Sequence, residues 1–506
     1  MTPTQPARTS RLPPPLPRLP PWLRDSELQA WQADLHQRVE RVLADGEQGL
    51  GFLEEHIEQA SLEPRRLALE RALQAKAEAV PCLCTTCQGP LRRLEWLSRS
   101  IRSRFGPVEF ARAHGWCARC QTWSFPADLA LGLAPNATAS PFLQEAAALL
   151  VSKMPPAQAE AVAQRLLGVP LTRCSLDREA RRQGQRAQKL RAEQNALLDS
   201  WDTLQAEATR QNQTPSQGPF TLILEIDAWN IRERDDWGDT EKLRALAREP
   251  ERWHWVYTAT CFRLDHRGST AADRPVISER GYVATRLGID ELFRQLHREA
   301  VRRGLWQAAD VLVIADGAVW IWNAVADRFP KARQRLDLFH LRQHLWEIAH
   351  DLHGRDTPEA RAFVQPLLTH IHDDRAADVI AQLDQLRPRL AEAQRLKLER
   401  QTQYLRNNLG RMHYQQALAA QQAQRARSKK RAPAAHPTSS PSPLPEPVGS
   451  GAIESTARQY QCRFKRTGQF WTQVGDEALL CLETLWRNQR WTDLFPHARL
   501  TAKSRN

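Results

Sequence analysis

The sequence lacks any run of eighteen apolar residues, so no segment of it is expected to cross a membrane as a helix. Its first residues also lack the apolar core of a secretory signal and are rich in proline instead, as in Leu12-Pro-Pro-Pro-Leu-Pro17. We therefore expect a cytoplasmic protein that has no membrane partner and begins with a disordered tail.

Cysteine is scarce, with nine in 506 residues. Four of them form two Cys-x-x-Cys pairs, and the others are scattered. This pattern is typical of bound zinc in a reducing compartment and argues against a disulfide framework.

The two cysteine pairs bracket a strand-like stretch that includes residues 108–113. Four thiolates suit tetrahedral Zn²⁺, and the long gap between the pairs fits a zinc ribbon with an extended hairpin. Cys82 and His114 are possible substitute ligands, and unliganded cytosolic thiols are the simpler alternative. The expected zinc ligands are Cys84, Cys87, Cys117 and Cys120.

Acidic residues are outnumbered, 58 against 71 basic ones, which gives a formal net charge of +13. Basic chains of this size often bind polyanions, and nucleic acid is the first class to consider.

Residues 140–186 carry a helix-turn-helix pattern. A helix is predicted from Pro156 to a terminating Gly168, followed by a short turn and a second helix with Ser175 as its N-cap. Ordinary packing of two helices is the alternative. If the second helix enters the major groove of DNA, its arginines would face the duplex. These are Arg178, Arg181, Arg182 and Arg186.

Two acidic residues lie where apolar, β-branched runs end. Residues 220–227 and 311–316 each predict a strand that is buried on both faces, with Asp227 and Asp316 at their ends. An ionised carboxylate in such surroundings loses several kcal/mol of solvation unless it is compensated. A divalent cation is the usual compensation where carboxylates converge, so we expect a metal site.

Strands and helices are predicted in a definite order beyond residue 220. After the first strand come strands at 255–264 and 276–285, a helix at 289–303, the Asp316 strand, a helix at 319–328, a strand at 332–339, helices over 341–425 and a helix over 450–490. This α/β order is ribonuclease-H-like, interrupted by a helical insertion before the last helix.

Four motifs lie on this order: Ile226-Asp227, Ile314-Ala-Asp316-Gly317-Ala-Val-Trp320, Asp337-Leu-Phe-His340 and Gly449-Ser-Gly-Ala-Ile-Glu454. With them the chain resembles the DDE transposases of bacterial insertion sequences, in a lineage with an N-terminal zinc ribbon and helix-turn-helix. The resemblance covers roughly residues 80–480. Ala228 departs from it, because a glycine commonly follows the first aspartate, and Glu225 is a nearby alternative to Asp227.

The resemblance implies a two-metal site for phosphodiester cleavage. Asp227 would bridge two Mg²⁺ or Mn²⁺ ions, and Asp316 and Glu454 would each complete one. His340 would contact the scissile phosphate or order the site, with a structural histidine as the alternative, and Asp337 would support it. Trp320 and Trp471 would stack on a base or belong to the core. Arg463, Lys465 and Arg466 would contact phosphates or form a solvated basic face.

The resemblance also implies an enzyme that binds double-stranded DNA at terminal inverted repeats and at the target, cleaves it and transfers strands. It would act as a homodimer or larger assembly at the nucleoid. A nuclease without strand transfer and a non-catalytic DNA-binding regulator are the alternatives. The expected segments are 1–80, a tail and helices; 81–135, the zinc ribbon; 136–212, the helix-turn-helix and linker helix; 213–345, the catalytic core; 346–448, the helical insertion and linker; and 449–506, the helix that carries Glu454.

Overall fold

The computed structural model describes residues 25–44, 49–169, 171–198, 200–213, 218–234, 241, 245, 252–269, 275–430 and 445–496. The predicted proline-rich tail and parts of the two predicted linkers lie outside the described residues. The chain divides into two compact units, one ending at Gln183 and the other running from Gly184 to Pro496. None of the helices in the described part combines the length and apolar character needed to cross a membrane.

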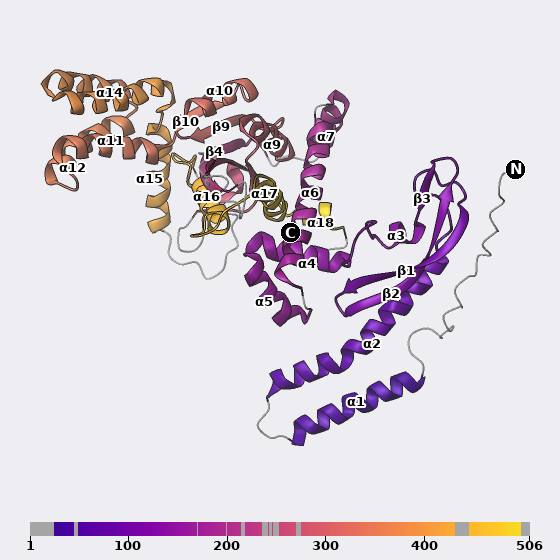
Figure 1. Ribbon diagram of the computed structural model, residues 1–506. Coiled ribbons are helices and arrows are strands. Elements are labelled where there is room, and N and C mark those ends of the chain that lie inside the picture. Colours follow the sequence, from indigo (N-terminus) through magenta and orange to yellow (C-terminus); the bar gives the residue numbers. More distant parts are fainter. Residues whose placement is uncertain are drawn as a thin grey trace. The chain divides into compact units, whose positions relative to one another are not determined.

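The first unit contains two long helices and a three-stranded antiparallel sheet (Figure 1). Its core joins Ala77 to Ile101, Val108 and Phe110. The buried Asp128 accepts ion pairs from Arg99 and Arg112, which neutralises its charge inside the unit. The elements are α1 (Asp25–Ala44), α2 (Leu50–Ala79), β1 (Arg92–Ser103), β2 (Gly106–Cys117), β3 (Thr122–Ser124) and α3 (Pro126–Ala130).

Helices α4 (Pro141–Lys153), α5 (Pro156–Leu167) and α6 (Arg173–Leu198) follow, and α7 (Trp201–Gln213) comes after them. Helix α5 ends at Gly168, whose φ of +60° is the left-handed conformation that glycine favours, as predicted. The prediction that Ser175 caps α6 is wrong. Thr172 accepts a hydrogen bond from the backbone N–H of Ser175 at 3.3 Å, so the helix begins at Arg173.

The second unit is built on a mixed five-stranded sheet with the order β10-β9-β4-β5-β8. Strand β4 lies at its centre, parallel to β9 and antiparallel to β5. The strands are β4 (Thr221–Glu233), β5 (Arg252–Arg263), β8 (Gly281–Thr285), β9 (Asp310–Ala315) and β10 (Arg333–Leu336). This is the mixed α/β architecture expected from the sequence.

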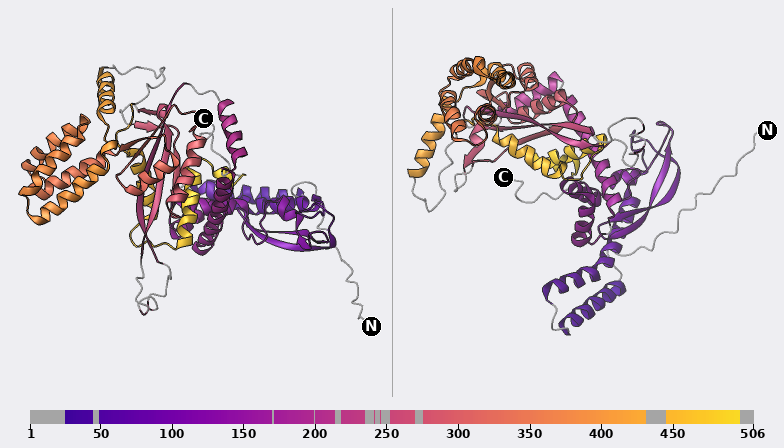
Figure 2. Two further views of the ribbon diagram at one scale, coloured as in Figure 1. Left: turned by 90° about the horizontal axis from the view of Figure 1, so that it is seen from above. Right: turned by 60° about the vertical axis from the view of Figure 1, so that its left-hand side comes forward.

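Helices cover both faces of the sheet (Figures 1 and 2). On one face, α9 (Ile289–Arg302) and α10 (Val319–Arg328) pack on Leu222, Leu224 and Ile226. On the other, Ala452 of α16 (Gly451–Phe464) packs on a cluster that contains Ile223 and Ile314. Helices α17 (Gln473–Arg487) and α18 (Trp491–Leu494) complete the described chain.

Three strand predictions were wrong in detail. Residues 276–285 form two elements, β7 (Pro275–Ile277), which pairs with β6 (Arg267–Ser269), and β8. The predicted strand 332–339 ends at Leu336, because the Asp337 side chain caps a helix. Strand β4 continues beyond Asp227 to Glu233, because its second half still pairs with β5 after β9 has ended.

The predicted helical insertion is present as five helices with their own apolar core, which includes Leu341, Val364 and Leu405. Figures 1 and 2 show it to one side of the sheet. The helices are α11 (Leu338–His353), α12 (Pro358–His372), α13 (Ala376–Leu386), α14 (Glu392–Asn407) and α15 (Gln415–Lys430).

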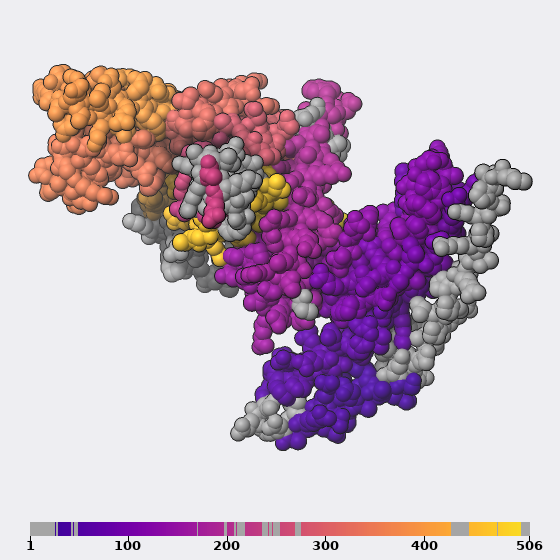
Figure 3. Space-filling model, viewed as in Figure 1, coloured from indigo at the N-terminus to yellow at the C-terminus, as the bar shows by residue number. Residues whose placement is uncertain are grey.

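The chain that returns from the insertion is held against β10. The guanidinium of Arg335 donates to the backbone oxygens of His413 and Pro447 and pairs with Glu446 at 2.9 Å. Arg333 pairs with the same glutamate at 2.6 Å. Figure 3 shows that part of the C-terminal segment (yellow) is exposed on this face of the molecule.

Candidate active site

Asp227 and Asp316 are brought to the same level by the parallel pairing of β4 with β9. Ile226 lies opposite Ala315 in this pairing, so Asp227 and Asp316 each come one residue beyond the last pair, and Asp316 directly follows β9. Side chains alternate along a strand, so Asp227 shares a face with Ile223 and Glu225. That face is the one covered by α16. Both aspartates are half-buried there.

Glu454 lies in the first turn of α16, over this face. Two carboxylates hold the start of that helix. Glu225 accepts a hydrogen bond from the backbone N–H of Ile453 at 2.7 Å, and Asp337 accepts one from Ser450 at 3.1 Å. Negative charge is favourable at a helix N-terminus, so both contacts fix the position of Glu454.

The acidic residues interact electrostatically. Burial, followed by the neighbouring Asp316 and Glu454 carboxylates, raises the pKa of Asp227 to about 6. Burial also raises the pKa of Glu225 to about 7. Asp227 and Glu225 therefore share a face of the sheet on which burial makes the ionisation of these two carboxyl groups unfavourable.

Asp337 and His340 form a hydrogen-bonded pair at the start of α11. Asp337 accepts from the backbone N–H of Phe339 at 3.1 Å as the N-cap, and its second oxygen lies 2.5 Å from His340 Nδ1. The hydrogen bond with Asp337, and then the Asp316 and Asp227 carboxylates, raise the pKa of His340. Burial raises the pKa of Asp337, but hydrogen bonds from His340 and the backbone outweigh it, and the net shift is downward.

Among the described residues, two groups of three or more side chains have the spacing of a metal site. One consists of Asp337, His340 and Glu454, whose ligand atoms all lie within 4.8 Å of one another. Asp227 and Asp316 are linked to it through the electrostatic interactions above rather than by this spacing. An open hollow of about 310 Å³ lies against Asp337 and Glu454, with Arg267 and the exposed Phe339 on its wall.

The insertion contributes a residue that the sequence did not predict. Tyr404 of α14 packs so closely on Gly317 that a Cβ atom there would lie 2.1 Å from its ring. Burial, followed by the Asp316 carboxylate, raises the pKa of Tyr404. The glycine of the Asp-Gly motif was the available signal, because it marks a close approach, although it does not identify the neighbour.

The basic residues after Glu454 differ in exposure. Arg463 is buried, with its guanidinium 5.0 Å from the ring centroid of Trp471, so it does not present the solvent-facing phosphate contact predicted for it. Lys465 and Arg466 are exposed. Trp471 is a core residue whose indole N–H donates to Phe464 at 2.7 Å. Trp320 is half-buried and packs edge-on against Tyr257.

The second group with metal-site spacing is the predicted zinc set of Cys84, Cys87, Cys117 and Cys120. The sulfurs of Cys87 and Cys117 lie 3.5 Å apart. Tetrahedral zinc with bonds of about 2.3 Å keeps its sulfurs about 3.8 Å apart, so the arrangement fits zinc. Backbone N–H groups of Cys87 and Thr86 lower the pKa of the Cys84 thiol, which favours the thiolate that binds metal.

His114 is not part of this group. Its ring stacks on Trp123 and Phe125, with centroid separations of 4.4 and 4.3 Å. Burial lowers its pKa. These contacts make His114 a packing residue beside the cysteines.

The arginines of α6, the predicted recognition helix, differ in exposure. Arg178 and Arg181 are exposed, and Arg181 pairs with Asp177 at 2.9 Å. Arg182 is half-buried and pairs with Glu179 at 2.5 Å.

No family model and no curated protein matches the sequence. Among solved structures, the chain is similar to one described as the Drosophila P element transposase strand transfer complex. The sequences are 11% identical, the match covers 69% of this chain and 92% of the other, and the TM-score is 0.30. A likeness this weak carries no inference about this chain.

Proposed function

We propose that the chain is a DDE transposase of a bacterial insertion sequence, with a ribonuclease-H-like catalytic core. The observation that carries the proposal is the placement of Asp227 on β4 and of Asp316 directly after the neighbouring parallel strand β9, on the face where α16 brings Glu454. These three carboxylates come from segments far apart in sequence and interact electrostatically on that face.

The residues fit divalent metal ions of the Mg²⁺ or Mn²⁺ type. Carboxylate oxygens are the ligands that such ions prefer. Burial, and then the neighbouring Asp316 and Glu454 carboxylates, raise the pKa of Asp227, and a bound cation would offset both costs. Asp227, Asp316 and Glu454 would hold the metal, and His340 lies next to them. When bound, the metal would activate the attacking water or 3′-hydroxyl and stabilise the leaving oxygen.

The protein's own residues position and neutralise the reacting phosphate. Asp337 orients the imidazole of His340 through Nδ1 and favours its protonated form. The other ring nitrogen, Nε2, then carries a proton that it can donate to a phosphate oxygen. Arg267, on the wall of the adjoining hollow, adds positive charge near the same place.

Double-stranded DNA is the proposed substrate. The net charge of +13 favours association with a polyanion. Arg178, Arg181 and Arg182 of the helix-turn-helix, with Lys465 and Arg466 near the active site, would contact the terminal inverted repeats and the target. We propose that a homodimer or larger assembly pairs the two ends, and that the zinc ribbon supports recognition.

The test is cleavage and joining of duplexes made from the DNA that flanks the gene. Metal-dependent nicking at the element ends, and joining of a pre-cut 3′-hydroxyl end to target DNA, are expected. Asp316→Asn should abolish both reactions and leave end binding nearly unchanged. Asp327→Asn, an exposed acid on α10 that pairs with Arg328, is the matched control.

Three outcomes would redirect the proposal. Full cleavage by Asp316→Asn would refute the site. Cleavage without joining would favour a nuclease of the same fold. Binding without any metal-dependent cleavage would favour a non-catalytic regulator.

A further inference from the structure

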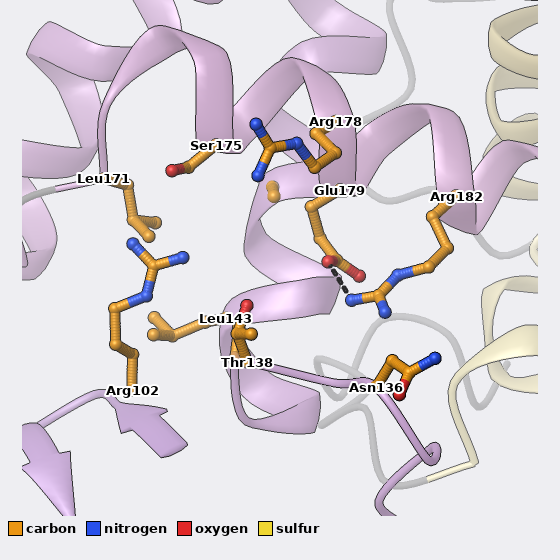
Figure 4. Close-up of a pocket in the computed structure, with 11 residues that line it drawn as sticks. Arg102, Asn136, Thr138, Leu143, Leu171, Ser175, Arg178, Glu179 and Arg182 are labelled. Atoms are coloured by element: carbon orange, nitrogen blue, oxygen red, sulfur yellow. Dashed lines mark hydrogen bonds and ion pairs between the residues drawn. The ribbon is translucent and has the colours of Figure 1, made fainter. Parts of the chain in front are cut away.

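A hollow of about 200 Å³ lies within the first unit, against the first turns of α6 (Figure 4). Its walls come from three separate segments. Arg102, near the end of β1, forms one side, and the chain around Thr138 forms the base. Ser175, Arg178 and Arg182 line it from α6. The hairpin and the proposed recognition helix therefore share one concave surface.

Two guanidinium groups at this hollow are uncompensated. Figure 4 shows Arg102 and Arg178 reaching it from different sides. Neither guanidinium makes an ion pair or hydrogen bond with any residue that the structure describes. Glu179 is the acid on the wall, but Arg182 already pairs with it at 2.5 Å. The hollow thus has a surplus of positive charge that its own carboxylate does not offset.

The remaining walls suit an oxyanion. Leu143, Ala147 and Leu171 form an apolar lining, which lowers the local dielectric and strengthens a charged contact made there. The hydroxyl groups of Ser175 and Thr138 can donate hydrogen bonds to the same guest. Guanidinium groups bind phosphate oxygens through two parallel hydrogen bonds. A phosphate group can accept hydrogen bonds from the hydroxyls and offset the charge of the guanidinium groups together.

We propose that Arg102 and Arg178 hold one backbone phosphate of duplex DNA in this hollow. The proposal rests on the proposed function for its ligand, a DNA duplex, and adds a binding site shared by the β1–β2 hairpin and α6. Phosphate contacts set the register and orientation of a protein on the duplex, whereas base contacts read the sequence. The hollow would fix the angle at which α6 enters the groove, and Arg102 becomes a DNA-binding residue outside the helix-turn-helix.

The experiment measures binding of the full chain to a DNA duplex across a series of salt concentrations, without divalent metal. Arg102→Ala should weaken binding several-fold and lower the slope of log affinity against log salt by about one, as expected for one lost phosphate contact. Arg102→Lys should restore most of the slope, because it keeps the charge. Arg165→Ala removes an exposed arginine of α5 outside the hollow and is the matched control.

The proposal is overturned if Arg102→Ala leaves the slope of log affinity against log salt unchanged, or if Arg165→Ala lowers that slope equally. If inorganic phosphate at matched ionic strength stabilises the wild type but not Arg102→Ala, while both bind DNA alike, the hollow takes free phosphate and the DNA assignment fails. Melting temperatures check folding. If Arg102→Ala does not fold, Arg178→Ala, exposed on α6, must show the same loss of slope or the proposal fails.

The readout separates this site from the catalytic proposal. If salt-dependent binding needs Arg102 but the protein does not cleave DNA, the phosphate site in the hollow is supported and the proposed catalytic activity is refuted. If the protein cleaves DNA with a metal, but Arg102→Ala has the same salt dependence of binding as the wild type, the catalytic proposal is supported and the phosphate site is refuted.

Discussion

The carboxylate of Asp337 accepts a hydrogen bond from the backbone N–H of Ser450 at 3.1 Å. Its other oxygen lies 2.5 Å from His340 Nδ1. A Cβ atom at Gly449 would come within 2.8 Å of the same carboxylate, so glycine permits this close approach. One buried side chain therefore positions both the histidine and the segment that delivers Glu454.

Asp337→Asn tests this positioning role. The amide cannot favour the protonated imidazole, so the pKa of His340 should fall from its raised value. If protonated His340 contacts phosphate, its contribution is lost as the pH rises through that pKa, and in the variant this loss moves to lower pH. Losses of about ten- to a hundredfold are typical when a supporting hydrogen bond is removed.

The measurement for Asp337→Asn is the pH profile of cleavage, with DNA affinity as the control. A uniform loss of activity with an unshifted profile would show that Asp337 serves folding alone.

Gly317→Ala should disrupt the contact between the insertion and the active site. The new methyl group would lie 2.1 Å from the ring of Tyr404. Overpacking of this kind costs about 1–3 kcal/mol, so a lower unfolding midpoint is expected. Adding Tyr404→Ala should recover part of the loss. Gly410→Ala is the control, because a Cβ atom there would meet nothing within 4 Å. Equal midpoints for Gly317→Ala and the control would contradict the contact.

Glu225→Gln should change how stability depends on pH. Burial raises the pKa of Glu225 from 4.5 to about 7. The folded state then binds more protons than the unfolded state between these values, so stability falls as the pH rises from about 4.5 to 7 and levels off above. Glutamine stays neutral and keeps an acceptor for the Ile453 N–H, so the variant should lose this part of the decline. Thermal melts from pH 4.5 to 8 measure it, and parallel curves for the two proteins would exclude the effect.

Metal analysis tests the cysteine cluster. About one zinc per chain is expected from a closed four-thiolate site. Cys117→Ala should release the metal and unfold its surroundings, because the thiolates and the metal hold this end of the hairpin together. Cys174→Ala, an exposed thiol outside the cluster, should keep its zinc. A metal-free wild type with the same melting temperature would rule out a structural ion.

Local patterns in the sequence correctly predicted several of the helices and strands of this fold. The helix predicted at 319–328 is α10 with the same limits, and Gly168 ends α5. Apolar runs located the strands that carry Asp227 and Asp316, because burial on both faces leaves a continuous pattern. Strand limits were less accurate at Asp337, where a side-chain cap competes with the ladder.

Local sequence patterns did not predict the contacts between residues that are far apart in the chain. Glu225 looked like a substitute for Asp227, but it holds the start of α16 through Ile453. Tyr404 lies on a helix whose periodicity indicates that one face is buried. The periodicity does not identify Gly317 as the residue that Tyr404 contacts. Arg102 and residues of α6 line the same hollow because of how the hairpin and the helices pack. A local window of sequence carries no information about that packing.

The late position of Glu454 in the chain has a consequence for synthesis. Strands β4 and β9 can leave the ribosome with two aspartates in place, while the helix that carries Glu454 is still untranslated. At about 5–20 residues per second, the interval between Asp227 and Glu454 is roughly tens of seconds. During that interval the nascent protein would hold the elements proposed to bind DNA but not its complete acidic cluster. Under the proposed function, newly made chains would therefore become able to cleave DNA only after nearly the whole polypeptide has been translated.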